Sequence, residues 1–151
     1  MYEIITTIHS VLRWFIIAAF LFALYRTFSG WRRSGTWQKQ DKNAGTFLVI
    51  FMDLQLVLGL ILFFFLSPLT EIAFQDMGSA MSNTVVRFYT VEHFLLMLIA
   101  IVLIHVGLFK SGRAEPDRKR HRMAFIYYLI AFILVLVAIP WPFLAYGRPL
   151  I

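Results

Sequence analysis

The chain alternates long apolar stretches with short polar connections that are mostly basic. Each apolar stretch has about 20 residues or more, enough to cross a hydrocarbon core roughly 30 Å thick as a helix. The four stretches are Ile4–Tyr25, Thr46–Leu66, Phe88–Phe109 and Met123–Tyr146. The pattern predicts an all-α integral membrane protein, a four-helix bundle that forms a single domain over residues 1–151.

The charges predict how the bundle is oriented. Basic residues gather in the first and third connections, Arg26–Gly45 and Lys110–Arg122, whereas Ser67–Arg87 between them carries few charges. Because basic connections stay in the cytoplasm, we expect both termini and the second connection outside, on the periplasmic face. The second connection is either an amphipathic segment that caps a site or a plain connector. Pro140 and Pro142 are expected to bend or end the fourth helix.

The amino-acid composition excludes several classes of protein, cofactor and partner. Hydrophobic residues make up 60% of the chain, far more than in soluble domains. The absence of cysteine excludes disulfides, cysteine-ligated metal centres and covalently attached haem. The net charge of +6 is explained by the two basic connections and anionic lipid, so no nucleic-acid partner is expected. No basic segment precedes the first stretch, which is expected to be a retained span rather than a signal peptide. No soluble-enzyme motif is present, and whether the chain is an enzyme stays open.

Two histidines lie inside the first and third apolar stretches. His9 and His93 each follow the outer start of their stretch by five residues, which is about 8 Å of helix rise. An ionisable ring in hydrocarbon marks a functional site by default. Two imidazoles at one level are the arrangement that holds a haem iron, so we expect His9 and His93 to ligate haem b. The alternative is a pair of neutral core histidines bonded to carbonyl or hydroxyl groups.

His105 and His121 form a second candidate pair, near the cytoplasmic face. His105 follows His93 by 12 residues, or about 18 Å of rise, which would suit a second haem. However, 12 residues also turn a helix by about 120° beyond whole turns, so these two rings do not share a face. His121 lies within RKRHR, where a solvated basic surface or lipid contact is the competing explanation.

Other polar residues lie within the stretches. Arg13 follows His9 by one helical turn on the same face and is a candidate cofactor-binding residue. Counted from opposite surfaces, Arg13 and Asp53 have similar depths, and we expect them to pair, as a clamp between helices or as part of a proton or quinone site. Arg87 and Arg148 are candidate partners for haem propionates.

The segments TIHSVLRW and VEHFLLMLIAIVLIHVG resemble those of four-helix membrane b-type cytochromes, a group that includes bacterial cytochrome b561. The resemblance covers about a quarter of the chain. It implies haem-ligand roles for His9, His93 and His105, electron exchange with a quinone, and a place in the bacterial inner membrane. The chain differs from this group in two ways. Its second apolar stretch has no histidine, and its fourth histidine lies at the edge of a span.

Three functions follow from these observations. The first is a b-type cytochrome that passes electrons between a quinone, or a partner subunit, and an acceptor through bis-histidine haem b. The second is a non-catalytic membrane subunit of a larger complex, in which the same residues only connect helices or bind a partner. Membrane lipid and either respiratory-complex subunits or further copies of the chain are the expected partners. The third is a small proton-coupled carrier.

Overall fold

The computed structural model describes residues 1–149, and all of the regular structure in that range is helical. Within these residues, four helical segments are long and apolar enough to cross a membrane, in agreement with the sequence. They are α1 (Tyr2–Arg33), α2 (Lys39–Ile61) with the π-helical turn η1 (Leu62–Leu66), α5 (Thr84–Arg87) continued by the π-helical turn η2 (Phe88–Glu92) and α6 (His93–Arg113), and α7 (Asp117–Ala138). Two short helices, α3 (Pro68–Gln75) and α4 (Met77–Ser82), complete the chain order.

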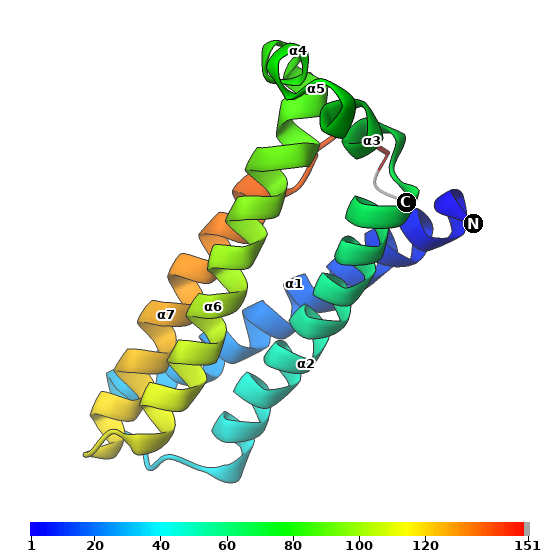
Figure 1. The fold of residues 1–151 in the computed structure, drawn as a ribbon. Coiled ribbons are helices and arrows are strands. Elements are labelled where there is room, and N and C mark those ends of the chain that lie inside the picture. The colour runs from blue at the N-terminus through cyan, green and yellow to red at the C-terminus, as the bar shows by residue number, and fades with distance from the viewer. Residues whose placement is uncertain (150–151) are drawn as a thin grey trace.

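The four long helices form a bundle in which each packs against two others. Helix α1 contacts α2 and α7, and α6 also contacts α2 and α7, so α1 and α6 lie diagonally across the bundle. Figure 1 shows the N-terminus and helices α3–α5 at one end, which we call the cap end. The connections 34–38 and 114–116 lie at the opposite end, called the basic end.

Polar contacts hold the basic end together. The carboxylate of Asp41 is buried, forms an ion pair of 2.8 Å with Arg26 of α1, and accepts a hydrogen bond from the backbone N–H of Gln38. Asp117, in the first turn of α7, accepts a hydrogen bond of 2.9 Å from the backbone N–H of Trp37. These bonds join residues 34–38 to α1, α2 and α7. Charge-assisted hydrogen bonds are among the stronger polar contacts, so they stabilise this end of the bundle.

Residues 67–87, at the cap end, were predicted to be either an amphipathic segment that caps a site or a plain connector. The structure shows that the plain connector is wrong, because these residues form helices. The side chains of Asp76 and Asn83 accept backbone N–H bonds at the starts of α4 and α5, as is typical of N-caps. Ala73, Ala80 and Val86 form a small buried core of their own. These helices therefore make a folded cover at this end of the bundle.

The fourth span also ends earlier than predicted. Helix α7 stops at Ala138, so residues 139–146 of the expected span are not helical. Ile139 has extended backbone angles because the ring of Pro140 disfavours a helical conformation in the residue before it. The two prolines thus end the helix rather than bend it.

Packing differs between the two halves of the bundle. In α1 no apolar side chain before Ile16 is buried, in α2 none after Met52, and in α6 none before Ala100. The continuous hydrophobic core therefore occupies the basic half of these three helices. Toward the cap end, the same helices surround a cavity.

Candidate functional site

The cavity lies in the cap half of the bundle and has a volume of about 150 Å³. Side chains of α1, α2 and α6 line most of it, and the cap contributes Ser67 and Thr70. Apolar groups such as Ile16, Phe63 and Met97 make up much of the wall. A mostly apolar pocket with a few convergent polar groups is the usual form of a small-molecule or cofactor site.

His9 and His93 face each other across this cavity. They come from the diagonal helices α1 and α6, and their ring centroids are 6.3 Å apart with the ring planes inclined at 59°. The structure therefore brings together the two rings that the sequence placed at one depth. A metal–imidazole bond is about 2 Å long, so two imidazoles that share one metal ion have centroids roughly 6 Å apart. The observed separation matches that value.

Hydrogen bonds hold the ring of His93 and the backbone of His9. His93 Nδ1 lies 2.7 Å from the carbonyl oxygen of Ala138, and because a carbonyl only accepts, Nδ1 carries the proton and donates. The other nitrogen of His93, Nε2, is then the one with a free lone pair. On the opposite side, the amide Nε2 of Gln55 donates a bond of 2.9 Å to the backbone carbonyl of His9. Gln55 thereby connects α2 to α1 at the level of the site.

Positive charge also lines the cavity. Arg13 of α1 and Arg148, beyond α7, both contribute to its wall, and none of the described lining residues is Asp or Glu. The guanidinium of Arg148 lies 4.6 Å from the centre of the Tyr89 ring. Arg87, the other propionate candidate, is instead 2.8 Å from Glu92 in a half-exposed ion pair and does not line the cavity. Two guanidinium groups therefore border the cavity.

Several polar atoms of the wall lack a partner. Within residues 1–149, Thr6 Oγ1, His9 Nδ1 and Gln55 Oε1 are buried without a hydrogen bond, and all three residues line the cavity. A buried polar group without a partner costs about 1–3 kcal/mol. Such groups gathered around one cavity indicate that a polar ligand or water satisfies them there.

The second histidine pair has a different geometry. His105 Nε2 lies 3.4 Å from Asp53 Oδ2, between α6 and α2, so the partner of Asp53 is His105 and not the predicted Arg13. His121 is buried against α1 at Gly30 and lies 4.8 Å, between ring centroids, from Trp37. The rings of His105 and His121 therefore contact different helices, and a haem between them finds no support in this arrangement. The solvated basic surface considered for His121 is also wrong, since its exposed fraction is 1%.

Two π-helical turns border the site, and the sequence did not predict them. Turn η1 continues α2, turn η2 leads into His93, and Phe63 of η1 stacks on Phe94 with ring centroids 4.4 Å apart. The hydroxyl of Thr70 donates a bond of 2.7 Å to the carbonyl of Phe63 and so holds η1. Single π turns are frequent at functional sites. The run of three phenylalanines and the polar Thr70 carry no recognisable signal for such a turn.

In the described part of the chain, no three His, Asp or Glu side chains are grouped so that they could hold a metal ion. Haem would need only two ligands from the protein, because its macrocycle would supply the others. Comparisons with protein families, with curated proteins and with solved structures give no match for this chain.

Proposed function

We propose that the protein is a membrane b-type cytochrome in which His9 and His93 hold haem b and electrons are exchanged with a quinone or a partner subunit. The observation that carries the proposal is the separation of 6.3 Å between two imidazole centroids across a cavity whose wall is largely apolar. His9 Nδ1 is also buried without a hydrogen bond, so this atom of the cavity wall is open to a ligand.

The donor set fits haem b. In metal-ligating histidines one ring nitrogen usually donates to a carbonyl or carboxylate, which orients the ring and leaves the other nitrogen for the metal. His93 has this arrangement through its bond to the Ala138 carbonyl. The resemblance to cytochrome b561-like proteins supports the same assignment for His9 and His93. One haem per chain is the stoichiometry that this arrangement supports.

The charged side chains of the cavity wall also fit haem b. Haem b carries two propionate groups, and Arg13 and Arg148 supply two guanidinium groups to a cavity whose described wall has no carboxylate. Arginine is the residue best suited to bind carboxylates with two parallel hydrogen bonds. Arg13 and Arg148 are thus the residues that would hold the propionates.

The cap halves of three helices lack a packed apolar core of their own. The cap halves of α1, α2 and α6 contribute no buried apolar side chain, so a macrocycle there would take the place of a missing core. When bound, haem b supplies one-electron redox chemistry. The chain contributes ligation through two imidazoles, exclusion of water by Phe63 and Met97, and neutralisation of the propionates.

The proposed orientation follows the basic connections. Arginine and lysine flank the spans at the basic end, which supports an orientation with that end in the cytoplasm and the cap end, with the N-terminus, in the periplasm. The resemblance to bacterial cytochromes points to the inner membrane. Cysteine labelling of single-cysteine variants at Glu3 and Lys119, in intact cells and after lysis, tests this orientation, because the chain has no cysteine of its own.

An optical spectrum tests the cytochrome proposal. We expect the protein purified from haem-replete cells to show a Soret band and sharp reduced bands of six-coordinate haem, with one haem per chain. His9→Ala and His93→Ala should each lose these bands, whereas His105→Ala should keep them, since His105 does not line the cavity. A colourless preparation would contradict the proposal, as would a spectrum that survives both cavity substitutions in folded protein.

A further inference from the structure

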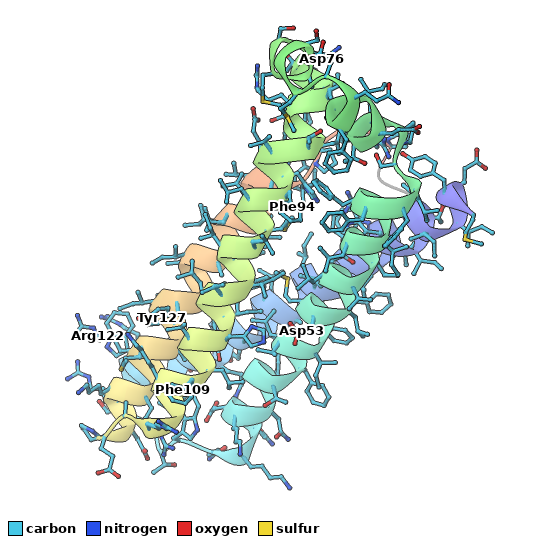
Figure 2. The ribbon with its side chains drawn as sticks, in the orientation of Figure 1. Asp53, Asp76, Phe94, Phe109, Arg122 and Tyr127 are labelled. Carbon is cyan, nitrogen blue, oxygen red and sulfur yellow. The ribbon has the colours of Figure 1, made fainter. Side chains whose placement is uncertain are left out.

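Asp53 and His105 form an ionisable pair on the face between α2 and α6, outside the cavity described above. Asp53 Oδ2 lies 3.4 Å from His105 Nε2, and the side chains are 47% and 45% exposed. In Figure 2, Asp53 lies about half way along the bundle, on the side of α2 that faces α6, with Phe94 nearer the cap end. Ile50, Leu54 and Val102 close by are exposed apolar side chains. The pair therefore opens onto lipid.

The depth of the pair excludes the usual partners. Asp53 follows Lys42 by 11 residues, or about 16 Å of helix rise, and precedes the end of η1 at Leu66 by 13. Half of a hydrocarbon core is about 15 Å thick, so the carboxylate lies deep within it. Neither bulk water nor a phospholipid headgroup is available at that depth, where polar side chains are costly and mark functional sites by default.

A hydrogen bond orients the ring of His105. Its Nδ1 lies 2.9 Å from the carbonyl oxygen of Ile101, which can only accept, so this nitrogen carries a hydrogen. The other nitrogen, Nε2, then faces Asp53 Oδ2 at 3.4 Å. It donates when the ring carries a second hydrogen and accepts when it does not, so the pair can serve a ligand that donates or one that accepts.

The pair also adjoins the proposed haem cavity. Ile101, whose carbonyl holds His105, lines that cavity, and so do Met52 and Gln55 on either side of Asp53 in sequence. A ligand that reached the pair from the membrane would lie against the wall of the cavity. The site requires a ligand that is soluble in hydrocarbon and carries both hydrogen-bond donors and acceptors. This ligand must approach from within the lipid bilayer.

We propose that the α2–α6 face at Asp53 and His105 binds the headgroup of a lipid-soluble quinone or quinol. A quinol hydroxyl donates to the Asp53 carboxylate, and a quinone carbonyl accepts from His105 Nε2–H. Binding is a property of this face alone. Only the direction of electron exchange rests on the proposed cytochrome function.

Equilibrium binding of a benzoquinone with a short alkyl tail, to the full chain in lipid nanodiscs, tests this inference. We expect saturable binding that Asp53→Leu and His105→Leu weaken about tenfold or more, since hydrogen bonds to charged groups contribute about 1.5–3 kcal/mol. Leucine on a lipid-facing surface is compatible with folding, so loss of binding would not reflect an unfolded protein. Glu92→Gln is the matched control, because Glu92 is also a half-exposed carboxylate in an ion pair, and this variant should bind as the wild type does.

The same measurement on His9→Ala separates this inference from the cytochrome proposal. Quinone binding that persists in a colourless His9→Ala protein supports the α2–α6 site whatever becomes of the haem. The inference is overturned if the wild type binds no quinone, or if Asp53→Leu and Glu92→Gln bind equally well. It is also overturned if Asp53→Leu changes only the oligomeric state, because a second copy of the chain would then cover this face.

Discussion

The contact between Gly30 and His121 provides a sharp test of the packing at the basic end. A Cβ atom added at Gly30 would lie 2.5 Å from His121 Nε2 and closer still to Cε1 and Nδ1. The imidazole is fully buried and packs on Trp37, so it has little room to move. Gly30→Ala therefore forces a methyl group into an occupied space between α1 and α7.

Two opposing effects determine how much Gly30→Ala changes the free energy of unfolding. Alanine is better than glycine in a helix interior by about 1 kcal/mol. Overpacking a well-filled core costs about 1–3 kcal/mol. Since the added methyl group overlaps three atoms of a buried ring, the cost falls in the upper part of that range. We expect Gly30→Ala to lower the free energy of unfolding by about 1–2 kcal/mol.

Gly112 supplies the control, because a Cβ there meets nothing within 4 Å. Gly112→Ala should be neutral or stabilising by at most about 1 kcal/mol. Reversible unfolding of both variants in detergent, followed by circular dichroism, measures the difference. Adding His121→Ala to Gly30→Ala should cost less than the sum of the single changes, since neighbouring sites couple by about 0.5–3 kcal/mol. Equal stability of the two alanine variants would refute the packing described here.

Two further predictions concern the cavity. Thr70→Val keeps the shape of the side chain but removes the hydrogen bond to the Phe63 carbonyl, and should lower stability by about 0.5–1.5 kcal/mol, measured by thermal unfolding. Arg148→Gln should weaken haem binding about tenfold because a charge-assisted bond to a propionate is lost. Arg87→Gln should leave the affinity unchanged because Arg87 is paired with Glu92, and titration of haem into haem-free protein compares the two.

The sequence predicted the spans and the depth of polar groups, and these rest on simple physics. Length and hydropathy determine how many helices cross, and a constant rise per residue determines the level of each side chain. His9 and His93 were placed at one level in this way, and the centroids of their rings lie 6.3 Å apart in the structure. The sequence did not predict that α7 ends at Ala138, although the cause is local, since Pro140 disfavours a helical conformation in Ile139.

What the sequence could not predict is the direction in which a side chain points around its helix. In a soluble bundle the polar face identifies the exposed side, but here both the lipid-facing and the core-facing sides are apolar. Asp53 was therefore assigned to Arg13 at a similar level, whereas it faces His105 on α6. The buried position of His121 was missed for a related reason, because the small Gly30 opposite creates space that neighbouring charges do not reveal.

The division of the bundle into a packed half and an open half links the fold to its proposed use. Ion pairs and hydrogen bonds around Asp41 and Asp117 connect the helices at the basic end, so the cap halves can stand apart without loss of the fold. Buried polar groups without partners, two arginines and two facing histidines then gather where the apolar core stops. A ligand that binds the folded state stabilises it in proportion to its affinity, and here it would also complete the missing core. The cap half is thus the part of the bundle whose order depends most on what fills the cavity.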